Sequence, residues 1–101
     1  MKNGVEFDFH VTNVGARKLE VNFPSGQTHE LVVLDSAGRE VWRWSSGRMF
    51  TQSLQNRVLH GSDSLSFALR WHHATAGHYV AVATLASDNF PMEQRAEFDV
   101  P

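Results

Sequence analysis

Hydrophobic and polar residues alternate with a period of two along most of the chain. The clearest alternation covers residues 5–11, where Val5, Phe7, Phe9 and Val11 are separated by polar residues. A period of two places every second side chain on one face of a β-strand, so this segment predicts a strand with one buried face. The same pattern predicts further strands over residues 19–23, 40–44, 65–71, 79–85 and 96–100. No stretch keeps the helical period for more than about one turn.

Turn sequences separate these predicted strands. Residues 31–34 are apolar on both faces, which predicts a central strand, and Asp35 and Gly38 then form a tight turn. Apolar residues between positions 49 and 59 are irregularly spaced, which predicts a loop and a short strand. Seven or eight short strands with frequent turns predict an all-β fold, an antiparallel β-sandwich. The absence of a repeat or linker predicts a single domain over residues 1–101.

A local feature at residues 77–81 favours the immunoglobulin-like version of this sandwich. In that fold a Tyr near the start of a late strand donates its hydroxyl to backbone a few residues upstream. Tyr79 stands at the corresponding place, and Ala81 takes the inward position of the second Cys in disulfide-bonded domains. The alternative is a Tyr that only begins a buried strand.

Two tryptophans share one face of the predicted strand over residues 40–44. If Trp42 and Trp44 face inward, they supply a large part of the core. If they face outward beside Arg43 or Arg48, they form a patch rich in the residue types of binding hot spots. The pattern favours an inward position for at least one of them.

Composition narrows the classes of function. Nine Lys and Arg against eleven Asp and Glu give a net charge of −2, so the basic excess of a nucleic-acid-binding domain is missing. No apolar run reaches the roughly 20 residues of a spanning helix, and no secretion signal is visible. Cysteine is absent, which excludes disulfides and cysteine-bound zinc and is compatible with a reducing cytoplasm. Neither nucleic acid nor a membrane is an expected partner.

The chain carries no recognisable catalytic or cofactor motif. It lacks the G-x-S-x-G, G-x-G-x-x-G and P-loop patterns, and turn chemistry explains Asp63 between two serines. The adjacent His72 and His73 could converge only in a loop, and no carboxylate stands at a ligand spacing beside them. We therefore expect no enzyme activity, no metal site and no cofactor.

Several short strings carry more specific information than the strand pattern. They are FPSGQ at residues 23–27, VVLD at 32–35, VWRWS at 41–45, GRMFTQ at 47–52 and GHY at 77–79. With these strings the chain resembles the BsuPI-type intracellular proteinase inhibitor family over nearly its whole length. Positions 60–61 depart from the resemblance, since they read His-Gly where Pro-Gly is usual.

The resemblance implies an immunoglobulin-like sandwich in a bacterial, cytoplasmic protein that inhibits an intracellular subtilisin-like serine proteinase. A monomer or weak dimer is expected. The alternative is a non-inhibitory immunoglobulin-like binding or scaffold module that keeps the same residues for folding. Addition of a partner strand to an exposed sheet edge is a further mode that any sandwich allows.

Two loops are candidates for binding a proteinase, because substrate-like inhibitors present an extended and rigid loop. The first covers residues 45–53 and contains Arg48, Met49 and Phe50, whose large apolar side chains suit a subtilisin-like specificity pocket. Alternatively, Met49 and Phe50 close one end of the core.

The second candidate loop covers residues 87–93 and contains Phe90, Pro91 and Met92. Proline fixes one backbone angle there, and its apolar neighbours have no predicted strand face to occupy. We expect either a protruding hydrophobic tip or a loop that caps the core.

Overall fold

The computed structural model describes residues 4–101, and all of its regular structure is β-strand. The eight strands are β1 (Val5–Thr12), β2 (Leu19–Phe23), β3 (His29–Asp35), β4 (Glu40–Arg43), β5 (Gln55–Leu59), β6 (Ser64–Trp71), β7 (Gly77–Leu85) and β8 (Met92–Val100). The predicted all-β class is confirmed. Within residues 4–101 no helix is long and apolar enough to cross a membrane.

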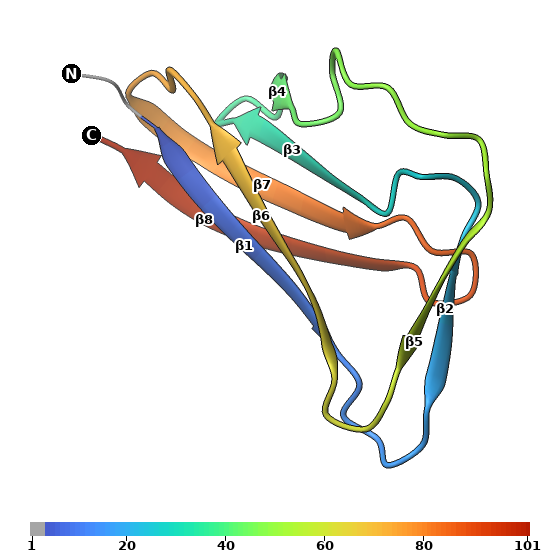
Figure 1. The fold of residues 1–101 in the computed structure, drawn as a ribbon. Helices are drawn as coiled ribbons and strands as arrows, with labels where there is room; N and C mark the ends of the chain where they lie inside the picture. The colour runs from blue at the N-terminus through green and yellow to red at the C-terminus, as the bar shows by residue number, and fades with distance from the viewer. Residues whose placement is uncertain (1–3) are drawn as a thin grey trace.

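The strands form antiparallel layers. One layer is a four-stranded sheet in the order β4-β3-β7-β8, and the ribbon of β1 and β6 lies across it (Figure 1). A second ribbon, β2 with β5, diverges from the first at the tip where the β1–β2 and β5–β6 turns meet (Figure 1). β3 has a partner on both sides, which confirms the central strand predicted from its apolar residues.

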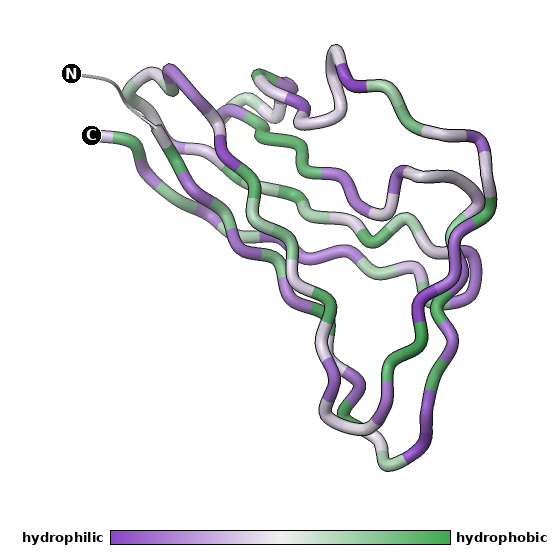
Figure 2. Tube along the Cα trace, viewed as in Figure 1, coloured by the Kyte–Doolittle hydropathy of each residue, from purple (hydrophilic) through white to green (hydrophobic). Residues whose placement is uncertain are grey.

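The core lies between these layers. One apolar cluster joins Val33 of β3 and Tyr79 of β7 to Trp71 of β6, and Phe7 and Phe98 pack against it. Because the two layers contribute to one cluster, the predicted sandwich is confirmed. Figure 2 shows the alternation of hydrophobic and polar residues along the strands that makes this one-sided burial possible.

The tryptophans of the β4 region face this core. The Trp42 ring lies 6.2 Å from that of Trp71 and 6.4 Å from that of Phe7. Trp44 packs, half-buried, against the cluster around Leu31. The prediction that at least one tryptophan faces inward is therefore confirmed.

Tyr79 makes the backbone contact expected from the sequence. Its hydroxyl donates a hydrogen bond of 2.8 Å to the carbonyl of Thr75, four residues upstream. This contact is the corner interaction of immunoglobulin-like domains. The corner is confirmed, while the complete immunoglobulin-like topology stays a prediction.

Replacing Tyr79 with phenylalanine is expected to lower the free energy of unfolding by about 1 kcal/mol, because the partly buried Thr75 carbonyl loses its donor. Urea denaturation followed by tryptophan fluorescence measures the change. An unchanged midpoint would mean that water replaces the hydroxyl without cost.

A buried asparagine holds the tip where the two ribbons meet. The Asn13 side chain donates to the carbonyls of Arg17, at 2.7 Å, and Leu59, at 3.0 Å. Its oxygen accepts the Gly15 N–H at 3.0 Å. Asn13 is only 3% exposed, so its amide replaces water at every one of these backbone groups.

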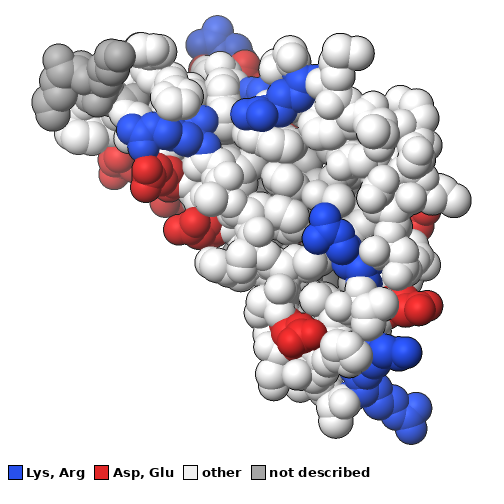
Figure 3. All heavy atoms as spheres, in the orientation of Figure 1, with Lys and Arg blue, Asp and Glu red and all other residues white. Residues whose placement is uncertain are grey.

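Charged side chains of both signs are interspersed over the surface seen in Figure 3. Among residues 4–101 no group of three His, Asp or Glu side chains lies close enough together to hold a metal ion. The features that remain for a functional site are therefore exposed loops and pockets.

Candidate functional site

The longest connection between strands covers residues 44–54 and joins β4 to β5. Two of its apolar side chains are largely in water, since Met49 is 96% exposed and Leu54 is 80% exposed. Covering such side chains with an apolar partner surface would be favourable. This loop, hereafter the 44–54 loop, is the strongest candidate contact surface.

Glu30 of β3 holds the beginning of the 44–54 loop. One carboxylate oxygen accepts the backbone N–H groups of Leu31, at 2.9 Å, and Ser45, at 3.2 Å. The other oxygen accepts the Ser45 hydroxyl and, at 3.2 Å, the guanidinium of Arg43. The Glu30 side chain is only 13% exposed, so these bonds are shielded from water.

The carboxylate of Glu30 is ionised at neutral pH. Burial opposes its ionisation most strongly, but the hydrogen bonds from Ser45, Leu31 and Arg43 together outweigh burial and lower its pKa below the ordinary value. The charged form is therefore the one that holds Ser45 in place.

Replacing Glu30 with glutamine is expected to lower the free energy of unfolding by about 1–2 kcal/mol at pH 7, because the amide brings no charge to Arg43. A pKa lowered by folding means that the stabilisation is complete above the ordinary value of 4.5 and is lost as the pH falls through the folded value. The difference between the proteins should therefore shrink in acid, as urea denaturation at pH 7 and pH 3 would measure. An equal difference at both pH values would contradict a role for the charge.

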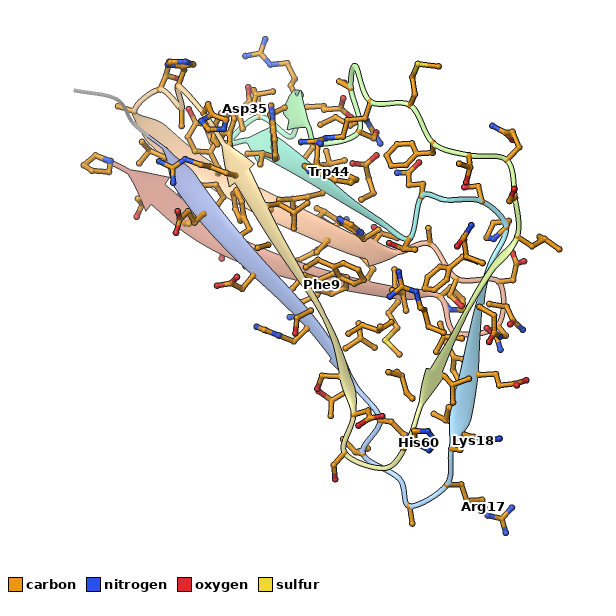
Figure 4. The ribbon with its side chains drawn as sticks, in the orientation of Figure 1. Phe9, Arg17, Lys18, Asp35, Trp44 and His60 are labelled. Carbon is orange, nitrogen blue, oxygen red and sulfur yellow. The ribbon has the colours of Figure 1, made fainter. Side chains whose placement is uncertain are left out.

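Stacked rings support the loop from below. The His29 ring lies between Trp44, at 4.3 Å, and Phe67, at 4.1 Å, while Phe50 lies 5.8 Å from Trp44 on the loop side. Figure 4 shows Trp44 beneath the loop. Burial lowers the pKa of His29, the charge of Glu30 partly offsets this, and Arg48 lowers the pKa further. The ring at the centre of the stack is therefore neutral at pH 7.

The far half of the loop is held by backbone. The Gly26 N–H donates to the Thr51 carbonyl at 2.9 Å, which ties the loop to the turn before β3. Near the start, a turn closes from Arg48 N–H to the Ser45 carbonyl at 3.0 Å, and Gly47 adopts a φ of 77° that favours glycine. The segment between Gly47 and Thr51 is thus fixed at both ends.

The two apolar residues predicted for this loop, Met49 and Phe50, lie in different environments. Phe50 packs on Trp44, as the core-closing alternative expects, whereas Met49 points into water. Arg48 lies over the Trp44 ring, with its guanidinium carbon 4.4 Å from the ring centre. Of the two apolar residues, Met49 is therefore the one that a partner can reach without disturbing the stack.

The second loop, predicted over residues 87–93, ends two residues earlier than expected. β8 begins at Met92, so Met92 and Glu93 belong to a strand and the loop ends at Pro91. A protruding tip is wrong for Phe90, which is half-buried and packs against the cluster around Val11 and Phe23. For Phe90 the structure shows the core-capping alternative, whereas Pro91 and Met92 are exposed.

Hydrogen bonds to β2 hold this second loop against the edge of that strand. The Asn89 side chain accepts the Asn22 N–H at 2.9 Å and donates to the Glu20 carbonyl at 2.7 Å, in the manner of a neighbouring strand. The Asp88 N–H donates to the Asn22 carbonyl at 2.8 Å, and so does the hydroxyl of the buried Ser87 at 3.0 Å. The loop covers the edge of β2, and Phe90 packs inward.

Sequence reasoning missed several residues of the site. Glu30 gave no signal because its partners Arg43 and Ser45 lie 13 and 15 positions away. Leu54 lies outside any periodic segment, so its exposure could not be read from the pattern. At the opposite tip Val14 is 94% exposed, and Figure 4 shows Arg17, Lys18 and His60 around that tip.

Comparison with known proteins identifies the family of the chain. A family model described as BsuPI, intracellular proteinase inhibitor, matches residues 1–90, which include the whole 44–54 loop. A search of curated proteins gives no match. The matched family is one of inhibitors rather than enzymes. Since the match covers most of the chain, the protein belongs to the BsuPI family of intracellular proteinase inhibitors.

Proposed function

We propose that the protein inhibits a subtilisin-like serine proteinase by placing the 44–54 loop in the cleft of the enzyme. The observation that supports this most directly is the Met49 side chain, 96% exposed on a loop that is held at both ends. An unbranched apolar side chain at the tip of such a loop suits an apolar specificity pocket.

Inhibition also requires a loop whose conformation is restrained before it binds. Binding costs less conformational entropy when the loop already has its bound shape. The contacts of Glu30 with Ser45 and of Gly26 with Thr51 supply this restraint on either side of Met49. A loop that keeps its shape after binding also resists rearrangement into a cleavable substrate.

The proposal assigns the contact to the 44–54 loop rather than to residues 87–93. Phe90 is part of the core and cannot enter a cleft without leaving it. Pro91 and Met92 are exposed beside Phe90 and stay secondary candidates for the edge of the interface. We further propose that the protein acts in the cytoplasm as a monomer or weak dimer.

Titration of the purified protein against subtilisin, with trypsin- and chymotrypsin-type enzymes as controls, tests the proposal. The expected result is stoichiometric loss of subtilisin activity while the protein stays intact on a gel. No loss of activity at micromolar protein, or rapid cleavage of the 44–54 loop, would contradict the proposed function and favour a binding or scaffold module.

A further inference from the structure

A pocket of about 440 Å³ opens beside the 44–54 loop. Its lining comes from β4, from the end of β6 and from the first residues of the loop. Both β4 and β6 are edge strands with a single hydrogen-bonded neighbour, so the layers leave this side of the sandwich open. The pocket therefore lies between two strands that are far apart in the sequence and next to the proposed contact loop.

The pocket combines indole walls with three cationic side chains and one acidic one, Glu40, which is paired with Arg43. Trp42 and Trp44 contribute the aromatic surface, and Arg43, Arg48 and Arg70 contribute guanidinium groups from three different elements. In Figure 3 several basic side chains, with acidic ones beside them, lie at the end of the molecule where Figure 1 places β4 and the end of β6. Tryptophan and arginine are the residue types most enriched in binding hot spots.

The three guanidinium groups are not equally available. Arg43 is engaged by Glu40, at 2.7 Å, and by Glu30, at 3.2 Å. Arg70 uses one terminal nitrogen for Glu6. Arg48 donates its Nε–H to the Trp44 carbonyl at 2.9 Å, and its terminal amino groups make no hydrogen bond to the described residues. Within residues 4–101, Arg48 and Arg70 thus keep guanidinium N–H groups without a hydrogen-bond partner, and both residues line the pocket.

We propose that this pocket receives an acidic side chain of the partner proteinase, with Arg48 and Arg70 as the residues that select it. The inference rests on the proposed function, because it assigns a second contact to the same interface. A guanidinium binds a carboxylate through two parallel hydrogen bonds, and the adjoining indoles exclude water from the pair. Since Arg48 directly precedes Met49, one face of an enzyme can cover both the pocket and the exposed methionine.

Charge reversal tests the selection by Arg48 and Arg70. The double variant R48E R70E is expected to associate with subtilisin about tenfold more slowly at low salt, because complementary charge acts mainly on the association rate. The wild-type rate should fall with added salt, and that of the variant should not. R57E is the matched control, since Arg57 is an exposed arginine of β5 outside the pocket. Equal association rates and salt dependence for R48E R70E and the wild type would overturn the proposal.

A direct binding measurement separates this inference from the proposed function. An acetylated tetraglutamate peptide, titrated at low ionic strength, is expected to shift the indole N–H signals of Trp42 and Trp44, with no shift from a tetralysine peptide. R57E should behave like the wild type, and R48E R70E should lose the shifts. Absence of shifts in the wild type would overturn the acidic selectivity. Shifts without inhibition of any proteinase would instead support the selectivity while contradicting the proposed function.

Discussion

Replacing Met49 with aspartate is expected to weaken inhibition of a subtilisin-like proteinase by about 100-fold, which corresponds to about 2.7 kcal/mol of binding free energy. The wild-type side chain is 96% exposed and makes the apolar tip of the loop, so its loss removes the contact and brings a charge into a desolvated cleft. The free energy of unfolding should change by no more than about 0.5 kcal/mol, because an exposed residue contributes little to the core. Inhibition constants and urea denaturation measure the two effects.

Val14→Asp is the matched control for this substitution. Val14 is 94% exposed and lies in the β1–β2 turn, at the tip opposite the 44–54 loop, so the same change of chemistry is made at a site outside the proposed interface. Inhibition by the Val14 variant should equal that of the wild type. If Met49→Asp inhibits as strongly as the wild type, the contact lies elsewhere and the assignment of the loop is wrong.

Replacing Asn13 with alanine is expected to lower the free energy of unfolding by about 3 kcal/mol, the largest stability change that we anticipate. The substitution leaves the carbonyls of Arg17 and Leu59 without their donor and the Gly15 N–H without its acceptor. Leu59 is itself buried, so water cannot readily replace the lost amide there. Thermal and urea denaturation of the purified variant measure the loss.

Asn56→Ala provides the comparison for Asn13. Asn56 is exposed, and its side chain donates to the side chain of Asn22 rather than to buried backbone. Its removal should change stability by no more than about 0.5 kcal/mol. Similar losses for the two variants would mean that the tip tolerates unpaired backbone groups and that Asn13 has no special role.

The local pattern of the sequence was enough to predict the strands and much of the core. The period of two identified the faces that carry Phe7, Trp42 and Trp71. One tyrosine at the right offset predicted a bond to upstream backbone, which the structure shows at the Thr75 carbonyl. These features depend on residues within one strand or one turn. The family resemblance added the expectation that the loop predicted over residues 45–53 binds a proteinase.

The orientation of loop side chains could not be predicted in the same way. Phe90 packs inward in a loop that Asn89 ties to Glu20, a residue 69 positions away. Met49 and Phe50 are neighbours of similar hydropathy, and only the position of Trp44 decides which of them is covered. Such outcomes depend on contacts between distant segments, which periodicity does not encode.

The way in which Glu30 holds Ser45 has a consequence for the conditions under which the loop keeps its shape. Many small secreted inhibitors rely on covalent cross-links that a thiol reductant can open, whereas here the same restraint comes from an ionised carboxylate in a chain without cysteine. High concentrations of glutathione or dithiothreitol should therefore leave the loop unchanged. Acid, which protonates Glu30, is expected to release the start of the loop, whereas a reductant is not.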